Sequence, residues 1–290
     1  LVSVTLLVSV GMSISIYNNK RIEMIQAMYG KYIAGFRGVE DDNVNKLKKF
    51  DGISKIGTTM IIGELQIGDS KMQIRGADTE AYDLLSIKPK KGSLPRKDGE
   101  IAIEECIYNK MMNKPALGEK FKLDYAYTDP NGGKVTQKER DYILCGILEN
   151  VTDKENPEVG KAYVTLNAAI SETTKYHRLF QQWFMIDNNL PVDSTLKKIN
   201  QYAVTRANSN ENIINGYRPN MDYIKALKDA QSARYLTIFF DIIVAIAVVM
   251  VIFNVFSISV LQRKRHYGLL RAIGITQKQI KGMLFGRMEK

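Results

Sequence analysis

The 290-residue sequence has few of the residues that build metal and nucleophilic centres. It contains two cysteines, Cys106 and Cys145, and two histidines, His177 and His266. Two thiols cannot form a tetrahedral thiolate zinc site on their own, and they allow at most one disulfide bridge. Whether the two cysteines are bridged or remain free thiols is left open by the sequence.

Motifs for common catalytic chemistries are also missing. The sequence has no G-x-x-x-x-G-K-[ST] loop to hold nucleotide phosphates, no H-E-x-x-H helix and no G-x-S-x-G turn. Carboxylates are numerous but scattered, and Glu104 and Glu105 would point to opposite faces of a strand. The sequence therefore predicts a non-catalytic protein with no cofactor and no metal.

Positive charge is in excess but is unevenly placed. The chain has 41 Lys and Arg against 31 Asp and Glu, a net charge of +10, and residues 263–290 alone contribute +7. A nucleic-acid-binding domain spreads basic residues over a folded face with interleaved aromatics, so this distribution disfavours a nucleic-acid partner. A basic block directly after an apolar run is typical of the cytoplasmic flank of a membrane helix.

An apolar run precedes the basic block and predicts a membrane helix over residues 234–262. From Leu236 to Leu261 it is broken only by Asp241, Asn254 and small hydroxyl residues. A helix of this length spans about 39 Å, which is enough to cross a hydrocarbon core of about 30 Å. A buried helix of a soluble protein is the alternative interpretation.

Residues 1–17 are apolar too. We expect them to be the outer end of a first membrane helix whose beginning lies before this sequence, and a signal-peptide segment is the alternative. The positive-inside bias then places residues 263–290 in the cytoplasm and residues 18–233 outside. We also expect one long helix over Met221–Leu261 and a matching helix over Ile16–Met28, which together form a stalk.

Alternating and periodic patterns in the outer region predict an α+β domain with split β-α-β units. Linker-like composition at residues 88–99 and 149–160 predicts two lobes, with a hairpin-rich insert over about 89–155 interrupting the first. The expected elements are helices over 44–50 and 194–208, the second capped by Ser194, and strands over 58–67, 71–75, 100–104, 120–128, 135–148, 161–166 and 183–187.

Two polar residues interrupt the membrane helix. A carboxylate inside a membrane segment is a functional candidate, so Asp241 is one hypothesis for a site. Its nearness to the outer end leaves open that it reaches the interface or pairs with Arg234. Asn254, near the inner end, is more typical of a hydrogen bond between helices.

The segment after the membrane helix has its own pattern. Gly268 and Gly274 allow sharp turns or close approach of another backbone, and Thr276 with Gln279 forms a capping box that starts a helix over 276–285. Ile280 begins a short apolar stripe on that helix. The segment is therefore either an amphipathic helix lying on lipid or a docking element.

This segment resembles the FtsX-like, or MacB-like, permease family of ABC transporters (type VII). The outer segments LPRKDGEIAIEE, LGEKFKL and YILCGILEN are similar, in the same order, to the family's extracytoplasmic core domain. His266 departs from the pattern, because the family usually has Glu there. The matching C-terminal residues are Arg263, Arg265, Tyr267, Gly268, Leu270, Arg271, Ala272, Ile273, Gly274, Thr276, Gln279 and Ile280.

The resemblance implies a permease in a bacterial cell membrane, with its large domain on the extracytoplasmic side. A separate cytoplasmic ATPase would bind a coupling element formed by Gly268, Leu270, Arg271, Ala272, Gly274, Thr276 and Ile280. A second permease subunit would complete a homo- or heterodimer, surrounded by membrane lipids. The cargo would be amphiphilic: an antimicrobial peptide, a lipoprotein or a lipid-like drug.

Two other functions remain open. The outer domain could hold and activate a cell-wall hydrolase, with no cargo crossing the membrane. Alternatively, the chain could be a two-helix receptor with an outer sensor domain, which would place it outside the permease family.

Overall fold

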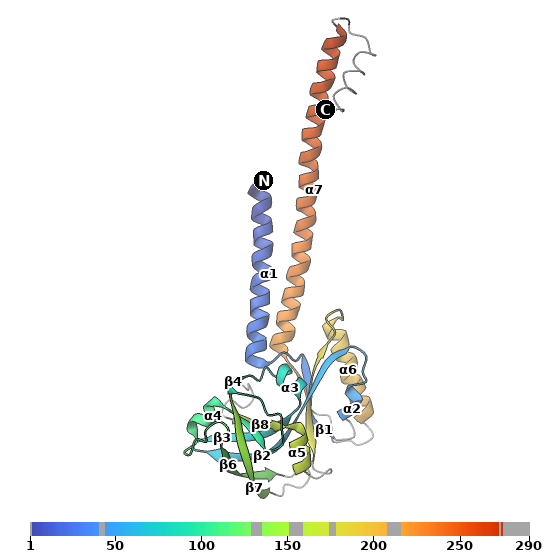
Figure 1. The fold of residues 1–290 in the computed structure, drawn as a ribbon. Coiled ribbons are helices and arrows are strands. Elements are labelled where there is room, and N and C mark those ends of the chain that lie inside the picture. The colour runs from blue at the N-terminus through green and yellow to red at the C-terminus, as the bar shows by residue number, and fades with distance from the viewer. Residues whose placement is uncertain are drawn as a thin grey trace. The chain divides into compact units, whose positions relative to one another are not determined.

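A computed structural model describes residues 2–40, 44–128, 135–150, 159–173, 178–207, 216–272 and Gly274 (Figure 1). The chain forms two compact units. One consists of Leu1–Tyr17 with Ala230–Lys290, and the other, Asn18–Asp229, is called the head below.

The head combines short helices with a large sheet, as the predicted α+β class requires. Its sheet contains strands β1 (Ala34–Glu40), β2 (Ile53–Ile67), β3 (Ser70–Ala77), β4 (Pro89–Gly92), β5 (Glu100–Glu104), β6 (Lys120–Thr128), β7 (Val135–Leu148), β8 (Val159–Thr165), β9 (Leu179–Ile186) and β10 (Tyr217–Pro219). The short helices are α2 (Val44–Leu47), α3 (Thr79–Leu84), α4 (Glu105–Lys110), α5 (Leu166–Glu172) and α6 (Val192–Ala207). Two long helices, α1 (Val2–Tyr29) and α7 (Met221–Ala272), each belong partly to both units.

Most strands were predicted within a few residues. The β2–β3 hairpin turns at Gly68 with φ of 57°, a backbone conformation that glycine adopts without a Cβ clash. The strand order is β10-β1-β9-β2-β3-β8-β5-β7-β4, with β6 pairing β2 and β7. Parallel pairs β3–β8 and β5–β7 supply the expected β-α-β character.

The strand pairings close a circuit. β2 pairs β3, which pairs β8, and the chain of pairings continues through β5 and β7 to β6. β6 then returns to β2 through one pair of residues, Glu64 and Ala126. We call these six strands the ring. Because β2 and β6 pair through one residue pair, theirs is the shortest strand pairing in the ring.

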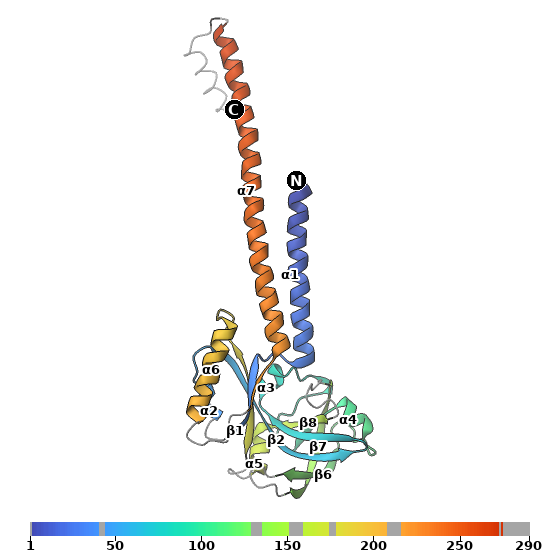
Figure 2. The same cartoon turned by 180° about the vertical axis from the view of Figure 1, so that it is seen from behind.

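The sheet is covered on two flanks. Figures 1 and 2 show α2 and α6 on one flank of the head and α4 on the opposite one. Phe36, Phe184 and Tyr217 pack against one another near the first flank, with centroid distances of 5.5 and 5.8 Å. Ile74 and Ile103 are fully buried in the ring strands. Burial of this apolar surface is the main force holding the head together.

Several details of the prediction were wrong. Helix α6 begins at Val192, and the Ser194 hydroxyl donates to the Pro191 carbonyl instead of capping the helix. The predicted linker 88–99 contains β4, which pairs with β7. One hydrogen-bonded sheet runs through the insert, and the head forms one compact unit; its division into two lobes stays a prediction.

The two cysteines are free thiols. Cys106 lies in α4, although its surroundings resembled a strand, because the strand ends at Glu104 and the helix begins directly after it. Cys145 lies in β7 as expected, and burial raises the pKa of its thiol to about 12. Because only the thiolate is an effective nucleophile, this shift lowers the reactivity of the Cys145 thiol.

Candidate functional site: the apolar helix and the base of the stalk helices

The apolar part of α7 exposes large hydrophobic side chains on every face. Ile242, Ile243, Val251 and Ile252 are all between 45% and 62% exposed, although at about 100° per residue they point in different directions around the helix. In the part of the chain that is described, α7 is the one helix long and apolar enough to cross a membrane, over Met221–Leu269. Such a helix is stable only if lipid or partner helices cover it.

The first membrane helix remains a prediction. Residues 2–17 are helical as part of α1, but α1 is not among the candidate spans found in the described residues. α1 does approach α7 closely within their shared unit. A Cβ atom on Gly11 would lie 3.1 Å from the Thr237 methyl carbon, so the small residue at position 11 lets the two backbones come together.

The two polar residues of the span lie on different faces of α7. Asp241 and Asn254 are both exposed. They are thirteen positions apart, which at about 100° per residue places them roughly 140° apart around the helix. Among the described residues there is no ion pair between Asp241 and Arg234, so the pairing considered from the sequence is absent. A single neighbouring helix could not satisfy both polar side chains.

The predicted coupling element is only partly described. Gly268 lies inside α7, so the sharp turn expected there is wrong: the helix continues to Ala272 because one glycine costs only about 1 kcal/mol in a helix interior. Gly274 does adopt a turn, with φ of 90°. The backbone of Leu270, Arg271 and Ala272 is helical. Thr276 and Ile280 lie outside the described residues.

Sequence reasoning missed the site where both long helices enter the head. The C-terminal end of α1 is closed by Gly30, whose φ is 92° and whose N–H donates to the Gln26 carbonyl. The Ser86 hydroxyl donates to the same carbonyl at 2.7 Å. The Leu84 carbonyl then accepts from the N–H groups of Lys31 and Tyr32. The end of α1 is thereby fixed to the loop that follows α3.

Asn220 fixes the start of α7 to the same place. Its side-chain oxygen accepts from the Tyr223 N–H at 3.4 Å, which caps the helix. Its amide nitrogen donates to the Tyr32 carbonyl at 3.2 Å, and its own N–H donates to the Ile33 carbonyl. Because Asn220 is only 6% exposed, water cannot replace these bonds.

Side chains also join the two helices to each other inside the head. Arg21 of α1 pairs with Asp229 of α7 at 2.7 Å, and the Gln26 amide donates to the Tyr223 hydroxyl at 2.9 Å. These contacts occur at two levels along the helices. We call the residues at this entry point the stalk base; they are Arg21, Gln26, Gly30, Leu84, Ser86, Asn220, Tyr223 and Asp229.

Next to the stalk base, one carboxylate bridges two cations from different elements. Asp83 of α3 accepts from Lys31 at 2.5 Å and from Lys55 of β2 at 2.6 Å. These two lysines hold the pKa of Asp83 below its ordinary value. The bridge ties the segment after α1 to α3 and to the long central strand.

This bridge predicts a pH dependence. A carboxyl whose folded pKa is depressed contributes stability above its ordinary pKa of about 3.9, and that contribution is lost as pH falls through the folded pKa. We expect Asp83→Asn to lower the urea midpoint of the head at pH 7, with the difference from the parent chain disappearing near pH 2. Asp124→Asn, at an exposed position in β6, is the control. A difference for Asp83→Asn that stays constant down to pH 2 would contradict the expectation.

Comparison with known proteins gives one family match. Residues 238–288 match a family model described as FtsX-like permease C-terminal, which covers most of the apolar run and the segment after it. This confirms the resemblance predicted from the C-terminal motif over those residues. The sequence has no match among curated proteins.

Solved structures with a similar course of the chain include one periplasmic and one extracellular domain. The periplasmic region of MacB from Actinobacillus actinomycetemcomitans has a TM-score of 0.47 at 13% identity, covering 72% of this chain and 98% of that one. The extracellular domain of the noncanonic ABC-type transporter YknZ from Gram-positive bacteria has a TM-score of 0.42 at 13% identity, covering 64% and 98%. Because both TM-scores are below 0.5, we draw the functional inference from the family match alone.

Proposed function

We propose, from the FtsX-like permease match over residues 238–288, that the chain is a permease subunit of an ABC transporter. In this proposal α7 crosses a bacterial cell membrane, residues 263–290 face the cytoplasm and the head lies on the extracytoplasmic side. The apolar exposure of α7 and the basic residues that follow it support this orientation. A second permease subunit would form a homo- or heterodimer with this one.

ATP hydrolysis would take place on a separate cytoplasmic ATPase, since the sequence has no phosphate-binding loop. The ATPase would bind the segment from Gly268 to Ile280. Two features support transmission of its motion to the head: α7 is uninterrupted from Met221 to Ala272, and Asn220 fixes its first turn to the sheet through backbone hydrogen bonds. A displaced helix would therefore carry the stalk base with it.

The substrate class follows from the resemblance. The FtsX-like resemblance implies an amphiphilic cargo, such as an antimicrobial peptide, a lipoprotein or a lipid-like drug. We propose export or extraction of such a cargo as the outcome of each cycle.

Two substitutions in the coupling element test this function. Gly274→Trp places a bulky residue at a φ of 90°, which side chains rarely adopt, and Ile280→Asp puts a charge on the predicted apolar stripe. We expect each to reduce co-purification of the ATPase and transport-coupled ATP hydrolysis at least about tenfold, a change of about 1.4 kcal/mol in binding. Thermal unfolding of the head should not change.

Val255→Leu is the control, because Val255 lies in α7 before the coupling element, is 63% exposed and stays apolar in the variant. It should leave the ATPase bound and active. If both Gly274→Trp and Ile280→Asp retain full ATPase binding and activity, the coupling assignment is wrong.

A further inference from the structure

The long strand β2 forks the sheet. Its residues Ile53–Met60 pair with β9, and its residue Glu64 pairs with β6 on the same edge, since β3 occupies the other edge at both places. The β2–β3 register shifts between Ile61 and Gly63. The sheet therefore has two branches that diverge from β2: a stalk branch of β9, β1 and β10, and the ring.

Both long helices connect directly to the stalk branch. The chain passes from α1 through Gly30 into β1, and from β10 through Asn220 into α7. The ring reaches the stalk base through Leu84, the last residue of α3, and through Ser86 in the loop that follows. A displacement of the helices would thus act first on one branch. The ring would follow only as far as contacts between the branches transmit the movement.

The C-terminal end of α5 lies at this fork and contacts both branches. On the stalk-branch side, Arg178, directly before β9, donates to the carbonyls of Ile170 at 2.8 Å and Thr173 at 2.9 Å. Thr173 lies against Met60 of β2, with its hydroxyl oxygen 4.0 Å from the Met60 sulfur. These bonds also give hydrogen-bond donors to carbonyls at the C-terminal end of α5, which have no partner within the helix.

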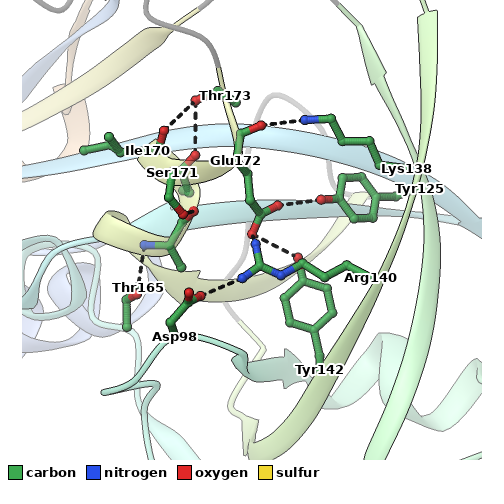
Figure 3. Close-up of polar contacts among 12 residues, drawn as sticks. Asp98, Tyr125, Lys138, Arg140, Tyr142, Thr165, Ile170, Ser171, Glu172 and Thr173 are labelled. Atoms are coloured by element: carbon green, nitrogen blue, oxygen red, sulfur yellow. Dashed lines mark hydrogen bonds and ion pairs between the residues drawn. The ribbon is translucent and has the colours of Figure 1, made fainter.

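On the ring side, one carboxylate collects three side chains of the β6–β7 hairpin. Figure 3 shows Glu172, the last residue of α5, facing Tyr125, Arg140 and Tyr142. The Tyr125 hydroxyl donates to it at 2.6 Å, the Arg140 guanidinium forms an ion pair with it, and the Tyr142 hydroxyl lies 3.5 Å away. Lys138 donates to the Glu172 backbone carbonyl at 2.6 Å.

The Glu172 contacts are shielded from water. The Glu172 side chain is 9% exposed and that of Arg140 is 25% exposed. Asp98, the second carboxylate that pairs with Arg140, is 64% exposed. Burial, followed by the charge of Arg140, lowers the pKa of Lys138. Loss of the carboxylate would leave Arg140 short of a partner in a partly buried place, which destabilises the docked hairpin more than loss of a surface ion pair would.

Glycine at position 63 makes room for this arrangement. A Cβ there would lie 2.2 Å from a ring carbon of Tyr125, so only glycine lets β6 approach β2 with Tyr125 reaching Glu172. The hairpin is thus held to the fork by one backbone rung and by the Glu172 cluster.

We propose that Glu172 is a fastener that closes the ring at the fork: while it holds Tyr125 and Arg140 the β6–β7 hairpin stays docked against α5 and β2, and when it releases them the hairpin separates from β2. This part of the proposal rests only on contacts within the head. That displacement of α1 and α7 drives the release rests on the proposed transport function.

Hydrogen exchange of the full 290-residue chain in detergent tests the fastener without an ATPase. In Glu172→Ala we expect the amides of Tyr125, Ala126 and Tyr127 to exchange at least about tenfold faster than in the parent chain. Amides in the β1–β9 pairing should keep their rates. Glu172→Gln, which retains an acceptor for Tyr125 but not the charge, should give an intermediate increase, and it decides the question if Glu172→Ala does not fold.

Glu139→Gln is the matched control, because Glu139 lies on the same hairpin and its ion pair with Lys122 is exposed. It should leave exchange at β6 unchanged. Equal acceleration in both branches, or no acceleration at β6 in Glu172→Gln, overturns the proposal. Because the chain is studied alone, either result is independent of whether an ATPase binds Gly274 and Ile280.

Discussion

Substitution of Val249 by aspartate is expected to prevent stable insertion of α7 into a membrane. Val249 lies near the middle of the apolar run and is 64% exposed, so no other described part of the chain covers it. A carboxylate at the centre of a membrane helix costs about 2.5–3.5 kcal/mol on insertion scales, whereas valine is slightly favourable. The fraction of α7 that spans the bilayer should therefore fall by roughly 100-fold.

The measurement is modification of a cysteine placed after the helix, at position 278, by a reagent that does not cross the membrane, in a chain whose free thiols Cys106 and Cys145 are replaced by alanine. In the parent chain we expect protection in sealed cells, and in Val249→Asp we expect labelling of the misinserted fraction. Val249→Leu keeps the residue apolar and should behave as the parent. Unchanged protection in Val249→Asp would indicate that α7 is not a span, or that a partner helix neutralises the carboxylate at this depth.

Substitution of Asn220 by alanine is expected to be the most damaging polar change in the head. It removes the cap of α7, worth about 1 kcal/mol, and leaves the part-buried Tyr32 carbonyl without its side-chain donor, which costs about 1–3 kcal/mol more. A total of about 2–4 kcal/mol corresponds to a Tm lower by roughly 5–15 °C for a unit of this size.

Differential scanning calorimetry of the chain in detergent measures this loss. Asn220→Ser retains an oxygen for the cap but loses the amide donor, so its Tm should fall between those of the parent and Asn220→Ala. Asn109→Ala, at an exposed position in α4, is the control and should shift Tm by less than about 2 °C. If Asn220→Ala melts like the control, the stalk base is not held by this residue.

The sequence predicted best those strands that are defined by local signals, namely alternation within the strand and turn residues at its ends. Lys120–Thr128 and Val135–Leu148 were predicted with the bounds that β6 and β7 have, because alternation runs through both and turn residues separate them. The β2–β3 hairpin is local in the same sense. Ser194 was misassigned because a serine near a helix start can cap it or lie in its first turn, and Pro191 had already set the start at Val192.

The stalk base and the Glu172 cluster could not have been predicted in the same way. Asn220 contacts Tyr32 across 188 positions, and Glu172 contacts Tyr125 across 47. A sequence pattern reports the face of an element on which a residue lies, but not which distant residue it will meet. The nearest signal was an asparagine directly before a long helix at Met221, which is a typical cap and was not used.

The sequence by itself determined the apolar run of α7, its basic flank and the motif that resembles FtsX-like permeases. These are properties of consecutive residues, because a helix crosses lipid through its own length and composition. Only the tertiary structure decided that the sheet forks at β2, that both long helices join one branch, and that Glu172 holds the β6–β7 hairpin of the other branch at the fork. Those features depend on which strands pair and which side chains are buried together, and chain folding brings these residues into contact from positions far apart in the sequence.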